Sequence, residues 1–233
     1  MSEPFDYQEL LSHFSGQAPL FPLPNIVQFP NTWQPLHIFE PRYRAMVEEA
    51  LAGDRLIAMV LLRPHWESAY DTKQAEVHQT VCLGRIDVEE RLSGGRFNLV
   101  LHGLCRARIE SEIQTDQLFR TAELTLLPDF YPTEATIDRQ HRHRELLSGA
   151  AEMLPELHSD PLVHQLLDAE LPLGVLCDVL AHSLGLDTDN AQLLLEELDV
   201  DLRSDLVLHL MKKRKRQESF AGHRYFPPAF SRN

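Results

Sequence analysis

The sequence lacks the motifs on which nucleotide hydrolysis and covalent catalysis often depend. Its 10 glycines are dispersed among 233 residues, and neither GxxxxGK(S/T) nor GxGxxG occurs. Such motifs supply the backbone N–H groups that hold phosphates, so their absence argues against an ATPase. The GxSxG turn of many serine hydrolases is also missing, and the nearest matches are LSGGR (92–96) and AHSLG (181–185). The sequence therefore predicts no catalytic residue.

Cysteine and long hydrophobic runs are also scarce. The three cysteines, Cys82, Cys105 and Cys177, form no CxxC pair, and an odd, dispersed set is typical of reduced thiols in a cytoplasmic protein. The longest apolar run is IAMVLL (57–62), far short of the roughly 20 residues that span a bilayer. The acidic N-terminus carries no signal-peptide pattern. We therefore expect a soluble, cytoplasmic protein with no membrane partner.

Patterns of metal ligands are missing as well, although the chain has 12 histidines. His141 and His143 lie two residues apart, about 200° around a helix, and so cannot both face one ion. Asp178 and His182 could share a helix face, but two ligands leave a zinc site incomplete. No HExxH occurs. We expect neither a metal nor another cofactor.

Positive charge is in the minority, because 22 Lys and Arg face 35 Asp and Glu, for a net charge of -13. This balance disfavours a general affinity for nucleic acid. The basic run KKRKR (212–216) could still be a nucleic-acid patch. The alternative is a set of cations that complement the dipole at a helix C-terminus, and the overall charge favours it. We therefore do not expect nucleic acid as a partner.

What the sequence does contain is a β-rich first half. Alternating or continuous apolar residues predict strands at 20–23, 25–29, 33–39, 55–62, 81–91, 96–110 and 118–127. Pro22, Pro24 and Pro30 cannot donate to a ladder, which places the first strands at edges or bends.

Helical periodicity follows Pro128. Expected helices lie at 134–154, from Asp160-Pro161 onward, at 171–186, after a cap formed by Asp189 with Gln192, and at 201–213. Strands followed by helices indicate an α+β fold. We divide the chain into a polar extension (1–18), a β-rich unit (19–128), a helical unit (129–216) and a tail (217–233).

The segment PLHIFEPRYRAMVEEAL (35–51) joins a strand to a helix that opens at Pro41. Glu40 lies four residues before Arg44, a spacing that allows an ion pair on the first turn. Arg42 is expected to point elsewhere, toward a backbone carbonyl or a partner. Because no nucleophile or second carboxylate lies nearby in the sequence, we predict that Glu40, Tyr43 and Arg44 form a structural corner and not an active site.

The polar loop RPHWESAYDTKQAE (63–76) carries two aromatic residues among charged ones, and loops of this length are often functional. Trp33 and Phe39 flank the corner and are expected to extend the same apolar patch. The predicted partner-binding residues are therefore Trp33, Phe39, Arg42, Trp66 and Tyr70. The alternative is that Trp66 folds back and caps the barrel.

Three segments resemble the N-terminal substrate-binding domain of Lon protease. The first, FPLPNIVQFPNTWQPLHIFEPRYRAMVEEAL (21–51), is similar to the proline-marked strand and PLxIFExRY corner of that family. The second, VCLGRIDVEERLSGGRFNLVLHGLCRARI (81–109), is similar to its glycine-marked strand, hairpin and G-x-x-R strand. The third, at 174–213, resembles its final helical segment.

The resemblance implies a PUA-like β pseudo-barrel followed by a helical bundle. It also implies a domain that binds protein substrates or partners and has no catalytic residues of its own. The ATPase and peptidase domains of Lon do not follow here, so we expect a stand-alone form. The leading hypothesis is a non-catalytic module that binds unfolded polypeptide or a protein partner and is linked to proteolysis. The alternatives are an enzyme with a pocket between the two units, and an RNA-binding protein suggested only by the PUA-like fold.

Overall fold

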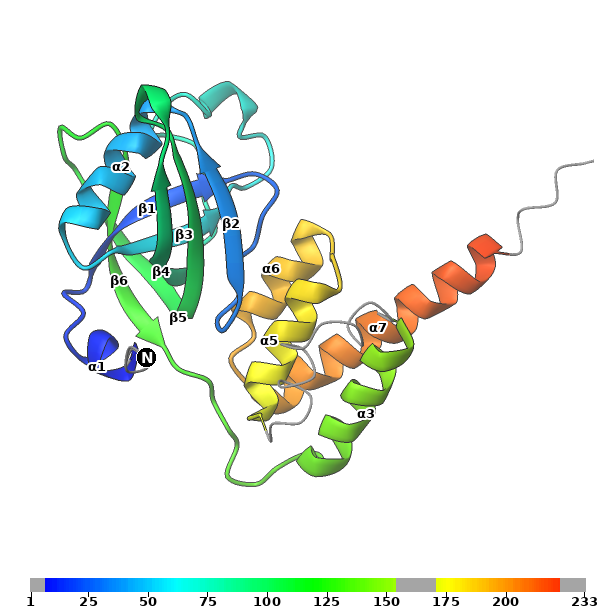
Figure 1. Ribbon diagram of the computed structural model, residues 1–233. Coiled ribbons are helices and arrows are strands. Elements are labelled where there is room, and N and C mark those ends of the chain that lie inside the picture. The colour runs from blue at the N-terminus through cyan, green and yellow to red at the C-terminus, as the bar shows by residue number, and fades with distance from the viewer. Residues whose placement is uncertain (1–6, 154–170, 223–233) are drawn as a thin grey trace, which may run out of the picture.

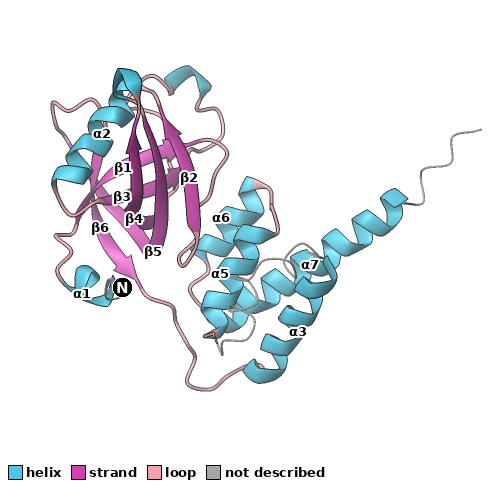
Figure 2. Cartoon of the chain, viewed as in Figure 1, coloured by secondary structure: helices cyan, strands magenta, loops and turns pink. Residues whose placement is uncertain are grey.

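Strands fill the first half of the chain and helices the second (Figures 1 and 2), which is the predicted α+β arrangement. The computed structural model describes residues 7–153 and 171–222. The strands are β1 (Gln17–Leu23), β2 (Trp33–Ile38), β3 (Leu56–Leu61), β4 (Thr80–Arg91), β5 (Phe97–Ile113) and β6 (Arg120–Leu127). The α-helices are α1 (Tyr7–Ser12), α2 (Pro41–Ala52), α3 (Arg139–Met153), α5 (Leu173–Ser183), α6 (Thr188–Glu196) and α7 (Val200–Gly222).

The six strands form one sheet in the order β2-β5-β4-β3-β1-β6, and β5 also pairs with β6. The 17-residue strand β5 makes this possible, because its first part pairs with β2 and β4 and its last part with β6. The sheet thus curls back on itself as a pseudo-barrel, and β2 remains at its edge. Helix α2 buries one face against the interior, where Tyr43, Met46 and Val47 meet the inward side chains of the strands.

Two predictions about the first strands were wrong. Residues 25–29 form no strand, because Gln28 turns inward and its amide donates to both oxygens of Thr32, while Phe29 packs into the core of the helical half. Strand β1 is not at an edge, since it pairs with both β3 and β6. Pro22 is tolerated there because the β6 pairing stops at Leu20.

The helices start at different residues from those predicted. Helix α3 begins at Arg139 and not at 134, because the carboxylate of Asp138 accepts a hydrogen bond from the N–H of His141. Helix α6 is capped by Asp187, which accepts from the N–H of Asn190, and not by Asp189. The helix predicted from Asp160-Pro161 lies outside the described residues.

The basic run at 212–216 lies within α7, which continues to Gly222, so it does not lie at the C-terminus of its own helix. Arg214 does meet a helix C-terminus, because its guanidinium donates to the carbonyl of Leu184, the C-cap of α5. Lys212 pairs with Glu145 at 3.0 Å and Lys215 pairs with Glu152, and both acids lie on α3. These cations therefore help to hold two helices together, a contact that local sequence cannot reveal.

A buried ion-pair network, which we call the joint, connects the two halves. Arg106 of β5 donates to both carboxylate oxygens of Asp178 on α5, at 2.9 and 2.5 Å. Arg203 of α7 pairs with Asp129 at 2.7 Å, and Arg106 also contacts Asp129 at 3.4 Å. Burial lowers the pKa of Arg106, but the charge and hydrogen bonds of Asp178 outweigh it, so the pKa is raised. The network keeps β5 fixed against the helices.

Candidate functional site

The strand-to-helix corner is built around the carboxylate of Glu40. Its Oε2 accepts from Arg42 Nε at 3.1 Å and Nη2 at 2.9 Å, and its Oε1 accepts from the Tyr70 hydroxyl at 2.9 Å. Arg42 Nη1 donates to the backbone carbonyl of Tyr70. The guanidinium of Arg42 lies 4.5 Å from the ring centres of both Tyr43 and Tyr70. These contacts attach the 63–76 loop to the start of α2.

The predicted ion pair between Glu40 and Arg44 is therefore wrong, because the Glu40 carboxylate pairs with Arg42. Side chains at the start of a helix lean toward its N-terminus, which brings Arg42 back over Glu40. Arg44 contributes its backbone N–H to the Glu40 carbonyl at 2.9 Å. Its guanidinium lies beside Gly95 in the β4–β5 turn.

The two tyrosine hydroxyls of the corner stay protonated near neutral pH. Burial raises the pKa of Tyr70, and its hydrogen bond to Glu40 raises it further. Burial likewise raises the pKa of Tyr43, whose hydroxyl donates to the Pro22 carbonyl at 3.2 Å. The corner thus contains two neutral phenols and one ion pair, an arrangement suited to holding a loop in place.

The predicted partner-binding residues fall into two groups. Trp66 packs edge-on against Tyr70 with ring centres 5.1 Å apart, both rings are half-buried, and Tyr70 in turn lies against Arg42. Trp33 and Phe39 are 51% and 60% exposed and lie at opposite ends of β2. Six residues of extended chain separate them by about 20 Å. The structure therefore brings Trp66, Tyr70 and Arg42 together but sets Trp33 apart from them.

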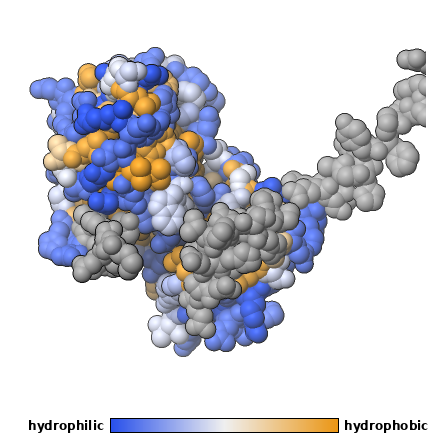
Figure 3. Space-filling model, in the orientation of Figure 1, coloured by the Kyte–Doolittle hydropathy of each residue, from blue (hydrophilic) through white to orange (hydrophobic). Residues whose placement is uncertain are grey.

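Eight of the residues that the sheet presents away from the core lie in three cross-strand rows, which we call the outer face. The aromatic row is Trp33 of β2 beside His102 of β5, the apolar row is Pro35, Val100 and Val88, and the polar row is His37, Asn98 and Glu90. Residues between them, such as Leu99 and Leu101, point inward and are buried. A shallow groove of about 420 Å³ crosses the apolar and polar rows. Figure 3 shows hydrophobic residues gathered on the visible side of the β-rich half.

Each row has a distinct chemistry. Trp33 and His102 stack with ring centres 4.5 Å apart and planes 7° apart. Burial lowers the pKa of His102, so its imidazole is neutral near pH 7, and its Nδ1 lies 3.5 Å from Asp87. Val88 is 58% exposed.

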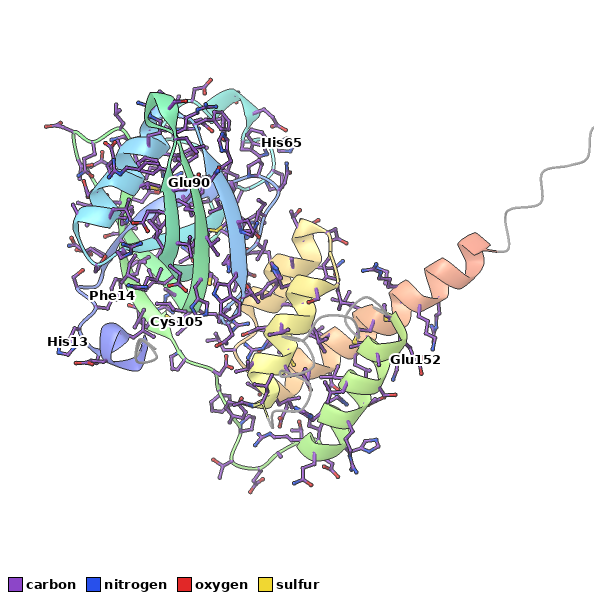
Figure 4. The ribbon with its side chains drawn as sticks, in the orientation of Figure 1. His13, Phe14, His65, Glu90, Cys105 and Glu152 are labelled. Carbon is purple, nitrogen blue, oxygen red and sulfur yellow. The ribbon has the colours of Figure 1, made fainter. Side chains whose placement is uncertain are left out.

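The polar row is hydrogen-bonded across the strands, from His37 Nδ1 to Asn98 Oδ1 at 2.8 Å and from Asn98 Nδ2 to Glu90 Oε2 at 3.0 Å. Figure 4 shows Glu90 on the β4–β5 hairpin and His65 on the 63–76 loop.

The residues that the sequence predicts for partner binding include Trp33 but no other member of this face. The alternation in 81–91 and 96–110 identifies outward positions such as Val88 and Val100, but not which of them lie opposite each other. Irregularities of register between Leu83 and Gly84 and between Ile86 and Val88 set that pairing. The sequence signal that could have revealed this face was an apolar residue, Val88, among acidic neighbours.

Two further kinds of chemical group are the cysteine thiols and the side chains that commonly bind metals. Burial raises the pKa of Cys105 and Cys177 to about 12 and that of Cys82 well above its ordinary value, so all three thiols are protonated near neutral pH. Within residues 7–153 and 171–222, no group of three or more His, Cys, Asp or Glu could hold a metal ion. None of the helices described there is long and apolar enough to cross a membrane.

Asp178 and His182, considered above as a helix-face pair, do not act together. Asp178 is 1% exposed and bound by Arg106, so its carboxylate belongs to the joint. His182 is exposed at the surface of α5.

Comparison with known proteins identifies the family. Residues 17–213 match the family described as the ATP-dependent protease La (LON) substrate-binding domain. Lon protease 2 of Myxococcus xanthus is 25% identical over 203 residues, covering 84% of this chain and 24% of that protein. Lon protease of Trichlorobacter lovleyi is 29% identical over 200 residues, with the same two coverages. The chain thus spans about a quarter of the length of these curated relatives.

Solved structures of Lon N-terminal domains share the fold. The N-terminal domain of the Mycobacterium avium complex Lon protease superposes with a TM-score of 0.65 at 17% identity, covering 84% of this chain and 98% of that one. A Lon N-terminal domain protein from Xanthomonas campestris gives a TM-score of 0.61 at 22% identity, covering 83% and 97%. This chain belongs to the Lon substrate-binding-domain family.

Proposed function

We propose that the protein is a non-catalytic module that binds extended, apolar polypeptide segments on the outer face of its sheet and thereby serves proteolysis. The observation that carries this proposal is the contiguous apolar surface formed by Trp33 and the apolar row, next to a hydrogen-bonded polar row. Exposed apolar surface that is rimmed by polar residues is typical of protein-binding sites. Unfolded chains are a suitable class of ligand because they expose the side chains that a folded protein buries.

In this proposal the β-rich unit is the binding part and the helical unit is its support. The joint favours such a division, because it fixes β5, which contributes one residue to every row, against α5 and α7. The three cysteines form no disulfide, which supports a reducing, cytoplasmic setting.

The side-chain face is a better contact surface than the free edge of β2. An edge strand exposes backbone groups that can pair with another chain. Pro35 in the middle of β2 has no backbone N–H to offer. Its carbonyl already accepts a hydrogen bond from the side-chain amide of Gln34 at 3.1 Å. We therefore propose that a ligand lies across the rows and does not add as a further strand.

Binding can be measured by fluorescence anisotropy with an unstructured apolar peptide of about 12 residues, long enough at about 3.3 Å per residue to cross the face. Trp33→Ala and Val88→Asp should each weaken binding by about tenfold or more, since a central aromatic or apolar anchor carries much of an interface's free energy. The matched control is Leu202→Asp, at a residue of α7 that is also about half exposed. If neither substitution, at Trp33 or at Val88, changed the affinity for the peptide, the proposed site would be refuted.

The non-catalytic character has its own test. The purified protein should neither hydrolyse ATP nor cleave an unfolded protein, because its sequence carries neither a phosphate loop nor a GxSxG turn. Phosphate release and gel-based proteolysis are the two assays. Turnover that a single substitution in this chain abolishes would contradict the proposal.

A further inference from the structure

We propose that the outer face binds residues 223–233, HRYFPPAFSRN, of a second copy of this chain. This inference rests on the proposed function, because it names one polypeptide segment that the same surface would take. The protein would then be able to cover its own binding face by self-association, and an external polypeptide would have to displace the segment.

The composition of the segment matches the surface. It holds three aromatic residues, two adjacent prolines and two arginines, with no acidic residue, in a chain whose net charge is -13. Proline-rich segments are already extended and lose little conformational entropy when they dock on aromatic surfaces. The aromatic row offers such a surface, because Trp33 stands against His102 and is 51% exposed.

The spacing of the segment also matches the rows. The rows follow one another every two residues along β2, at about 6.6 Å per step. In an extended segment, Pro228, Phe230 and Arg232 share one side at the same interval. With Pro228 against the indole of Trp33, Phe230 meets the apolar row. Arg232 then reaches the polar row, where the exposed carboxylate of Glu90 is held by Asn98.

The geometry of α7 assigns this contact to a second copy. Helix α7 begins beside the β-rich half, where the N–H of Val200 donates to the Phe130 carbonyl at 3.0 Å, and runs away from that half (Figure 1). Its 23 residues carry the chain about 34 Å from that point at 1.5 Å per residue. Eleven further residues reach at most about 40 Å. Within one molecule, the segment would use nearly its whole length to get back from the end of α7 to the β-rich half. Too few residues would then be left to cross the rows.

The first experiment is fluorescence anisotropy of labelled HRYFPPAFSRN titrated with the full chain. We expect Val88→Asp in the protein and Phe230→Ala in the peptide each to weaken binding by about tenfold or more. Ser231→Ala in the peptide, on the side turned away, should leave the affinity unchanged. Arg232→Glu should weaken binding to the natural protein, and Glu90→Lys should restore it. Circular dichroism checks that each protein variant is folded.

The second experiment is sedimentation velocity of the full chain over a range of concentrations. The natural chain and Ser231→Ala should self-associate alike, whereas Phe230→Ala and Val88→Asp should remain monomeric. Equal self-association in all four proteins, or peptide binding that is indifferent to Val88, would overturn the inference. If an unrelated apolar peptide binds in a Val88-dependent way while HRYFPPAFSRN does not, this inference fails and the proposed function stands. If neither peptide depends on Trp33 or Val88, the proposed function fails as well.

Discussion

Strand β5 contributes residues to both the joint and the outer face, but charged side chains are buried in the joint and exposed on the outer face. In the joint, the side chains of Arg106 and Asp178 are each 1% exposed and each charge has a partner. On the outer face, charged Glu90 is exposed beside apolar Val88. A buried charge must be paired because desolvation is costly, whereas an exposed charge remains able to meet a new partner. Burial, and not residue type, thus separates the structural cluster from the outer face.

The sharpest way to break this comparison is to remove a charge from the joint. Asp178→Ala leaves Arg106 buried without its main counter-ion and should lower the free energy of unfolding by about 3–5 kcal/mol. Urea denaturation followed by circular dichroism measures the change. The control Asp205→Ala removes a surface carboxylate that pairs with Arg142, and it should cost less than about 1 kcal/mol. Equal losses in both variants would mean that the joint contributes no more than a surface pair.

Trp66 tests whether the corner belongs with the outer face or with the scaffold. If the 63–76 loop contacts the ligand, Trp66→Ala should cost about 2 kcal/mol of binding free energy while the fold survives. Anisotropy with the apolar peptide and thermal unfolding are measured on the same sample. Glu67→Ala, at the exposed neighbouring position, is the matched control. A fall in thermal stability with unchanged affinity would instead assign Trp66 to the scaffold.

Glu40 tests the interpretation of the corner as a scaffold. Glu40→Ala removes the acceptor for three hydrogen bonds and leaves Arg42 and Tyr70 without it. We expect unfolding free energy to fall by about 1–2 kcal/mol, with no change in peptide affinity. Glu48→Ala, an exposed acid on the same helix, should have little effect on unfolding. Lost affinity at unchanged stability would show that the corner itself contacts the ligand.

The smallest expected effect is the pH dependence of the α6 cap. The hydrogen bond from the Asn190 N–H lowers the pKa of Asp187 below its usual value. A carboxyl with a lowered pKa in the folded state stabilises fully above its unfolded pKa, and this contribution is lost as pH falls through the folded pKa. Asp187→Ala should cost about 1 kcal/mol at neutral pH and progressively less below about pH 3.9. Asp187→Asn, which keeps an acceptor oxygen without the charge, should remove the pH dependence. A constant difference across this range would contradict the assignment of the cap.

The sequence by itself determined the α+β class, the helix that opens at Pro41 and the family likeness. Each depends on residues that are close together along the chain, where hydrophobic period and proline position act directly. Predictions from the sequence failed where the partner of a side chain depends on the direction in which that side chain points, or lies far away along the chain. Glu40 pairs with Arg42 and not with Arg44 because side chains at the start of a helix lean toward its N-terminus.

Only the tertiary structure decided the joint and the rows of the outer face. Asp178 was visible in the sequence, but its partner Arg106 lies 72 residues earlier, and no local pattern links them. Val88 stands opposite Val100 only because β4 and β5 shift register between Ile86 and Val88. A shift of one residue would turn every following side chain to the other side of the sheet, so the outer face depends on strand pairing that composition and periodicity leave open.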